Sequence, residues 1–139
     1  MTRIAARLRQ AVRDRAHGCC EYCKLSEADA FLPHEVDHTI AVKHGGETGL
    51  DNLCLSCFDC NRRKGSDLTS IDPEGGAIVP LFNPRQQRWE DHFRLNEALI
   101  YPLTAQGRVT IQLLRMNEPE QLEKRTVLIG LGRYPCTVA

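Results

Sequence analysis

The sequence lacks a long apolar run, a recognisable signal peptide and an excess of charge of either sign. A transmembrane helix needs about 20 consecutive apolar residues, and the 139-residue sequence contains no such run. Residues 1–15 carry five arginines, which leaves no room for the apolar region of a signal peptide. We therefore expect a cytoplasmic protein that makes no contact with a membrane.

The net charge is zero, because 18 lysines and arginines balance 18 aspartates and glutamates. This balance argues against a general binder of polyanions. It conceals a segregation, since residues 1–17 carry five arginines and one acid (net +4), whereas residues 24–59 carry two lysines and seven acids (net −5). An acidic centre between basic flanks suits a cation site at which a phosphate backbone is held from either side. For any one of these residues, a solvated surface charge is an equally good explanation.

The sequence contains seven cysteines, which in a secreted protein would indicate a disulfide framework with one cysteine left over. Without a secretory signal, closely spaced cysteine pairs indicate a metal site instead. Cys20 and Cys23 form one C-x-x-C pair. Downstream, Cys57 and Cys60 form another, but Cys54 and Cys57 have the same spacing. The spacing alone leaves both downstream pairs open as ligands.

Periodicity and turn residues predict the secondary structure of the first half. Residues 2–17 should form an amphipathic helix, because Ile4, Leu8 and Val12 make one apolar stripe. A strand, a turn-rich loop, a second strand and a short helix should follow; their expected ranges are 35–40, 44–52, 53–56 and 58–64, with Gly65 ending the helix.

Beyond Gly65 the local signals weaken. Trp89, His92 and Phe93 have helical spacing and are interpreted as core aromatics. The remaining expected features are a loop over 67–76, an apolar segment over 78–82, a helix over 104–116 capped by Thr104, for which a strand stays open, and a helix from Asn117 and Pro119 to about Leu131. We expect a helical or mixed extension over about 66–139 and a single domain of α+β class.

Three residue types that suit phosphodiester chemistry lie close together in the first half. Asp37 and His38 are adjacent in the expected first strand, Asn52 follows fourteen residues after His38, and Asn61 follows nine residues later. Each has an ordinary structural explanation when taken alone, such as a turn or a helix cap. Together, and close to the two C-x-x-C pairs, these residues supply oxygen ligands for a hard cation and an imidazole base within one short segment.

This combination resembles the HNH endonucleases, which are ββα-metal (His-Me finger) nucleases with a four-cysteine zinc clip. The resemblance covers residues 7–65 well, and the phrase LFNPR…W…HF extends it to about residue 117. It implies an α+β fold with a zinc-clipped ββα-metal core over about 18–65. Strand, loop, strand and helix were expected from the residues in the same order.

The resemblance also implies which cysteines bind zinc. They are Cys20, Cys23, Cys57 and Cys60, because the last cysteine should directly precede the motif's asparagine. The site should be structural, since four thiolates leave no open position for water. The 33 residues between the two pairs (57 − 23 − 1) then contain the hairpin. Cys54 becomes a buried strand residue and Cys19 a spare thiol.

Catalytic roles follow from the same resemblance. Asp37 and Asn61 should hold Mg²⁺ or a similar divalent cation, and His38, whose free imidazole has a pKa of about 6.5, should act as general base. Asn52 should tie the loop to the backbone of the histidine. Phosphate contacts are expected from the basic run Arg62, Arg63 and Lys64. Strict alternation sends Asp37 and His38 to opposite faces of a strand, so we expect a twist or a bulge there.

The sequence therefore predicts a metal-dependent DNA endonuclease. The first alternative is a non-catalytic, zinc-stabilised nucleic-acid-binding module, which would be favoured if Asp37, His38 or Asn61 were missing; all three are present. The second alternative is a cysteine-based redox sensor, which needs an exposed thiol of low pKa. Its candidates are Cys19, Cys54 and Cys136.

Overall fold

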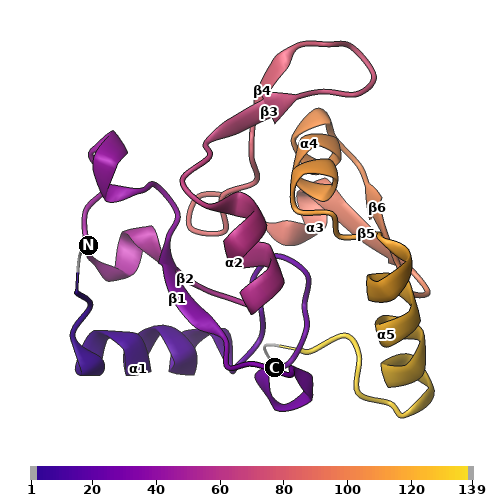
Figure 1. The fold of residues 1–139 in the computed structure, drawn as a ribbon, viewed down its shortest axis with the longest axis horizontal. Helices are drawn as coiled ribbons and strands as arrows, with labels where there is room; N and C mark the ends of the chain where they lie inside the picture. Colours follow the sequence, from indigo (N-terminus) through magenta and orange to yellow (C-terminus); the bar gives the residue numbers. More distant parts are fainter. Residues whose placement is uncertain (1–2, 138–139) are drawn as a thin grey trace.

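The first half of the protein is built around a two-stranded hairpin (Figure 1). The structure, a computed structural model, describes residues 3–137. Strand β1 (Glu35–His38) pairs antiparallel with β2 (Leu53–Ser56), in register from Glu35 opposite Ser56 to His38 opposite Leu53. The expected second strand has the predicted bounds, whereas the first is shorter than predicted because it ends at His38.

Two helices cover the two faces of this hairpin. Helix α1 (Ala6–Ala16) packs Val12 and Ala16 against Leu53 and Leu55 of β2. Helix α2 (Phe58–Lys64), which has the predicted bounds, contacts β1 from the other face. The prediction of a helix over 2–17 is confirmed for Ala6–Ala16; its residue 2 lies outside the described residues. The predicted ββα order is therefore present, and helix α1 packs on the face of the hairpin opposite α2.

The ends of these helices follow from local chemistry. Helix α1 ends where His17 and Gly18 take left-handed conformations, with φ of 54° and 72°. Cys57 caps the start of helix α2, because its sulfur accepts the backbone N–H of Cys60. Gly65, with a φ of 52°, follows the last residue of the helix. The helix that carries Asn61 is thus started by a cysteine of the clip.

The second half is mixed, with two further hairpins and three helices among the described residues. The expected helix over 104–116 is confirmed as a helix, and Thr104 caps it by accepting the backbone N–H of Gly107. No helix in residues 3–137 is long and apolar enough to span a bilayer. The elements are β3 (Thr69–Ile71), β4 (Ile78–Pro80), α3 (Trp89–His92), β5 (Phe93–Asn96), β6 (Leu99–Pro102), α4 (Ala105–Leu113) and α5 (Pro119–Gly130).

The extension packs its aromatic core onto the turn that carries Cys20 and Cys23, which we call the first cysteine knuckle; Cys57 and Cys60 form the second. Trp89 and Phe93 are buried, as predicted, while His92 is only half-buried and bonds to the Thr104 hydroxyl. The indole N–H of Trp89 donates to the carbonyl of Tyr22 at 2.7 Å. The four clip cysteines belong to the same buried cluster as these aromatics. The clip therefore joins the hairpin half of the protein to the extension.

The C-terminal segment returns to the same knuckle and forms a disulfide there. Cys136 is bonded to Cys19, so the interpretation of Cys19 as a spare thiol is wrong. The backbone N–H of Cys136 donates to the carbonyl of Lys24 at 2.9 Å, and the hydroxyl of Tyr134 donates to the carbonyl of Cys23 at 2.6 Å. These bonds bring together two cysteines that lie 117 residues apart in sequence.

The disulfide leads to a prediction on stability. Because the bridge closes a loop of 117 residues, oxidised protein should lose about 2–4 kcal/mol of unfolding free energy when Cys136 is replaced by serine. The measurement is urea unfolding of parent and Cys136→Ser without reductant. The same comparison in a dithiol reductant is the control, and there the two proteins should differ little. Equal stability without reductant would contradict the prediction.

Candidate functional site

Four thiols from two knuckles meet in the interior. The sulfur atoms of Cys20, Cys23, Cys57 and Cys60 all lie within 4.8 Å of one another, and all four residues are buried. Zinc bonded to sulfur at about 2.3 Å in a tetrahedron implies sulfur atoms about 3.8 Å apart. The sulfurs of Cys23 and Cys57 are 3.7 Å apart. The cluster therefore fits a structural zinc ion with no position left for water.

The surroundings of the clip favour a negative sulfur at Cys20, whereas hydrogen bonds with Cys20 and Cys23 raise the pKa of Cys57 and of Cys60 far above its usual value. The backbone N–H of Cys23 donates to the sulfur of Cys20, and that of Cys60 to the sulfur of Cys57, each at 3.4 Å. Burial would raise the pKa of the Cys20 thiol, but hydrogen bonds from the other three clip thiols outweigh it and lower this pKa well below its usual value. A thiolate is the form that binds zinc.

Cys54 lies outside this cluster, although its spacing to Cys57 is that of a clip. It is fully buried in β2, with its sulfur 3.8 Å from the hydroxyl of Tyr22. Burial raises the pKa of the Cys54 thiol far above its usual value. Cys19 is held in the disulfide with Cys136. Cys54 thus lacks the exposed, low-pKa environment that a redox sensor needs, and Cys19 and Cys136 are bonded to each other.

The α2 face of β1 carries two carboxylates, each with a partner on α2. The side-chain amide of Asn61 donates to Glu35 at 3.0 Å. The ammonium group of Lys64 lies 3.5 Å from the carboxylate of Asp37 and 3.3 Å from the carbonyl of His38. Burial raises the pKa of Asp37 above its usual value, and the Lys64 ammonium only partly offsets this effect. This face thus holds a carboxylate whose ionised form is stabilised by a nearby cation.

His38 lies on the other face of the strand. One of its ring nitrogens, Nε2, is 2.9 Å from the hydroxyl oxygen of Thr48. The register of β1 and β2 is unbroken up to His38, so the bulge that was allowed for at this point is absent.

A groove lies beside the strand that carries Asp37 and His38. It has a volume of about 1130 Å³ and runs between α1 and β1, where it is lined by five consecutive residues, 34–38. Because β1 belongs to a two-stranded sheet, its second edge is unpaired. The groove is therefore lined by residues from both faces of β1, among them Asp37 and His38. The side chain of Asp37 is paired with Lys64 on α2, and that of His38 is bonded to Thr48.

Asn52 holds the loop that follows His38. Its side-chain carbonyl accepts the Thr39 hydroxyl at 2.7 Å and the Ile40 backbone N–H at 3.0 Å. Its amide group donates to the carbonyls of Ile40 at 2.9 Å and Glu47 at 2.8 Å. Gly46 allows this closure, since a Cβ there would lie 1.8 Å from the carbonyl oxygen of Ile40. Asn52 thus fixes the backbone next to the histidine.

The basic run on α2 makes contacts within the protein. Arg62 lies over the ring of Phe58, with its guanidinium carbon 4.6 Å from the ring centre. Arg63 donates to the carbonyl of Leu114 at 3.1 Å, and Lys64 is buried against β1. The phosphate contacts expected from these three residues stay a prediction.

Two residues of the site were not singled out from the sequence. Glu35, which accepts the amide of Asn61, lies two positions before Asp37, and the alternation of side chains in a strand places both on one face. That rule was sufficient to find it. Thr48, the partner of His38, belongs to a loop without periodicity, and no local signal marks it.

Comparison with known proteins agrees with this architecture. Residues 20–67 match the family described as HNH endonuclease. The chain is 23% identical over 131 residues to the Septu protein PtuB of Bacillus thuringiensis; the match covers 88% of this chain and 46% of PtuB. The chain thus spans about half the length of that relative. No solved structure matches the chain.

The matched segment contains both cysteine pairs of the clip and the two elements that carry Asp37, His38 and Asn61. The four-thiol cluster fits the zinc clip of such a fold. The match indicates a function of nuclease type. Residues 20–67 are therefore similar to an HNH domain, and they lie in a mixed α and β protein.

Proposed function

We propose that the protein is a metal-dependent endonuclease that hydrolyses phosphodiester bonds in DNA. In this proposal His38 is the general base, and Asp37 and Asn61 hold one divalent cation such as Mg²⁺. The observation that supports the proposal is that Asp37 and His38 line the same groove, on a strand with an unpaired edge, within the segment that matches the HNH family.

The oxygen donors present suit a hard cation. Mg²⁺ is commonly bound through one or two protein oxygens and retains several waters. Asp37 offers a carboxylate whose buried position makes a cation favourable. The hydrogen bond from Asn61 to Glu35 orients the side-chain amide, and among residues 3–137 the side-chain oxygen of Asn61 accepts no hydrogen bond. When bound, the ion would stabilise the charge on the phosphate and on the departing oxygen.

His38 would accept the proton of the attacking water. Thr48 holds one ring nitrogen and thereby fixes the orientation of the imidazole. Because Asp37 and His38 extend from opposite faces of the strand end, a phosphate at the edge of β1 would have the cation on one side and the base on the other. Such an arrangement would suit an in-line displacement, in which the water attacks from the side opposite the leaving oxygen.

The second candidate is a non-catalytic module that binds nucleic acid. The observation in its favour is the buried Lys64, whose ammonium group lies 3.5 Å from the carboxylate of Asp37. An internal cation there would make a divalent ion unnecessary for neutralising Asp37. This candidate shares the zinc clip and the basic surface with the first but predicts binding without cleavage.

Supercoiled plasmid DNA distinguishes the two candidates. Purified protein that retains its zinc should convert the plasmid to nicked or linear forms when Mg²⁺ is added, and should leave it intact when Mg²⁺ is omitted. By resemblance to HNH nucleases, the ends should be 5′-phosphate and 3′-hydroxyl. Omitting Mg²⁺ is a better control than adding a chelator, because a chelator also threatens the zinc clip. Binding without cleavage in Mg²⁺ and in Mn²⁺ would favour the non-catalytic module.

A further inference from the structure

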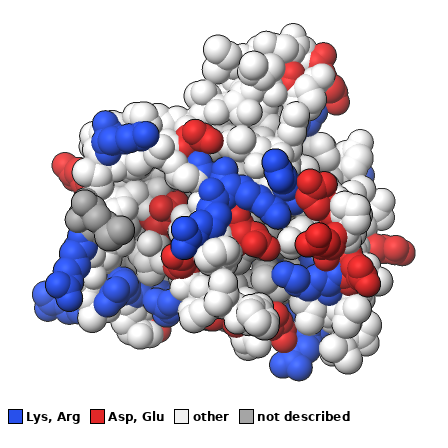
Figure 2. Space-filling view, viewed as in Figure 1, with Lys and Arg blue, Asp and Glu red and all other residues white. Residues whose placement is uncertain are grey.

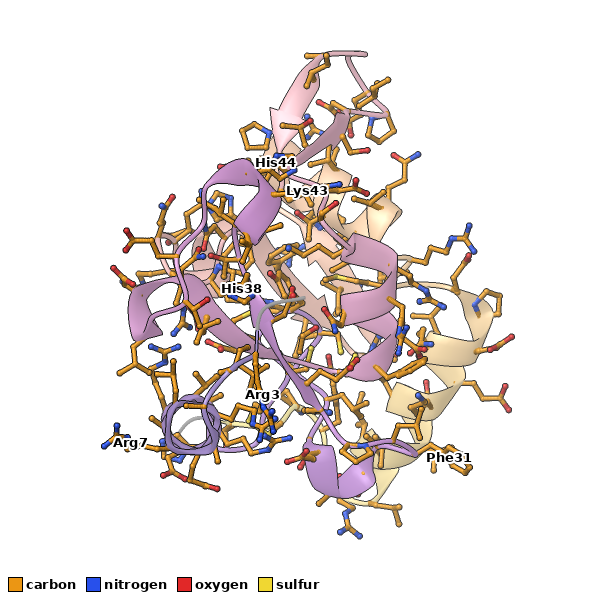
Figure 3. All side chains as sticks on the ribbon, turned by 60° about the vertical axis from the view of Figure 1, so that its left-hand side comes forward. Arg3, Arg7, Phe31, His38, Lys43 and His44 are labelled. Atoms are coloured by element: carbon orange, nitrogen blue, oxygen red, sulfur yellow. A yellow bond between two sulfur atoms is a disulfide. The ribbon has the colours of Figure 1, made fainter. Side chains whose placement is uncertain are left out.

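The groove along β1 has one basic wall and one acidic wall. Its α1 side is lined by Arg3, Arg9 and Arg13, and its β1 side by Glu35 and Asp37. Figure 2 shows Lys and Arg side chains gathered along α1 and over α2. In Figure 3, Arg3 lies on the side of α1 that faces His38, whereas Arg7 lies on the opposite side. The basic wall therefore leads directly to the candidate catalytic residues.

The arginines of the groove differ in how far they are already engaged. Arg13 donates to the carbonyl of His34 at 2.7 Å and lies 3.4 Å from the carboxylate of Glu27. Arg3 and Arg9 are exposed, and among residues 3–137 neither side chain makes a hydrogen bond or an ion pair. These two guanidinium groups remain available to an anionic ligand. The basic run of α2, in contrast, is engaged within the protein.

We propose that this groove is the track of the nucleic-acid backbone. Phosphates contact Arg3 and Arg9, and the scissile phosphate lies farther along, between Asp37 and His38. The inference rests on the proposed function and specifies the surface through which the substrate enters. A groove with one basic and one acidic wall fits a nucleic acid. Its arginines bind phosphates next to the scissile phosphate, and its carboxylate holds a cation at the scissile phosphate.

An extended peptide is the rival occupant of an unpaired strand edge. Strand addition draws its affinity from main-chain hydrogen bonds, and β1 has only four residues, Glu35–His38. A peptide would also leave the guanidinium groups of Arg3 and Arg9 without a specific role. The charge and the short edge therefore favour the phosphate backbone.

Two arginines of α1 provide a matched test. Residues two apart on a helix point in nearly opposite directions, since each residue turns the helix by about 100°. Arg9 lines the groove and Arg7 does not, while both are exposed and carry the same charge. Arg9→Gln and Arg7→Gln therefore change the net charge equally and differ only in the face they alter. Neither replacement removes a buried group, so both proteins should fold as the parent does.

The affinity for a short fluorescent DNA duplex of mixed sequence is measured at several salt concentrations. Divalent cations are omitted so that no strand is cut. Arg9→Gln should weaken binding and lower the slope of log K against log salt by about 0.9, the value for one lost phosphate contact. Arg3→Gln should act in the same direction. Arg7→Gln should leave the slope close to that of the parent.

Equal losses for Arg7→Gln and Arg9→Gln would overturn the inference, because they would show a diffuse charge effect. Unchanged binding in Arg3→Gln and Arg9→Gln would also overturn it and would leave the edge of β1 to a peptide. In both cases plasmid cleavage by the parent would still support the proposed function. A parent protein that neither binds the duplex nor cuts plasmid would overturn both proposals.

Discussion

His38→Ala protein should keep its fold and its zinc but cleave plasmid DNA about a hundred- to ten-thousandfold more slowly than the parent, the usual cost of losing a general base. His38 is the last residue of β1 and is only partly buried, and its side chain bonds to the hydroxyl of Thr48 in an exposed loop. Its removal therefore leaves no buried cavity and no buried unpaired group. The rate is measured at saturating Mg²⁺.

His44 supplies the matched control, because it is a second histidine near the same loop. Its side chain bonds to the carbonyl of Ser66 at 3.1 Å and is not among the groove residues. His44→Ala should cleave within a few-fold of the parent. If a folded His38→Ala protein cleaved as fast as the parent, His38 would have no part in the mechanism. Equal losses in both variants would indicate a general effect on the loop.

Asp37→Ala should fail for another reason, and the two failures can be separated. Loss of the carboxylate removes an anionic ligand and frees the buried Lys64 from its partner at 3.5 Å. Binding of Mn²⁺ should therefore weaken in Asp37→Ala and remain in His38→Ala. Mn²⁺ binding can be followed by titration of the zinc-loaded protein, which reports the metal site without relying on activity.

The secondary structure of the first half was predictable where the signals that start and end an element lie within a few residues of it. Strand β2 and helix α2 have the predicted bounds because alternation, the cysteine at the helix start and Gly65 all act over a few residues. The expected loop over 67–76 is wrong at Thr69–Ile71, which form β3 and pair with β4. The hairpin of β5 and β6 was also missed, because its turn carries Glu97 in a left-handed conformation, with a φ of 55°, where a glycine or asparagine signal is usual.

The site was predictable in composition but not in its contacts. The sequence supplied the types of ligand, and the resemblance chose Cys57 and Cys60 over Cys54, in agreement with the observed cluster. Three features depend on contacts between distant segments, which no local pattern encodes. They are the disulfide of Cys19 with Cys136, the pairing of Lys64 with Asp37, and the groove that brings α1 beside β1.

Cys57→Ala should give unfolded or insoluble protein, which is the largest effect on stability that we expect. Zinc binding to thiolates contributes on the order of 10 kcal/mol to the folding of small zinc peptides. Cys57 also caps helix α2, and its sulfur lies 3.7 Å from that of Cys23 in the other knuckle. Its loss therefore disconnects the helix that carries Asn61 from the first knuckle. Soluble yield and the far-ultraviolet circular dichroism of the refolded protein measure the effect.

Cys54→Ala is the control for this experiment, because Cys54 is equally buried and lies three residues away in β2 but outside the clip. It should retain one zinc per chain and lose about 1 kcal/mol of unfolding free energy, a usual cost for a single buried replacement. A folded, reduced parent without zinc would contradict the assignment of the clip. Comparable losses in both variants would mean that tight packing of thiols, rather than zinc, holds the two halves of the protein together.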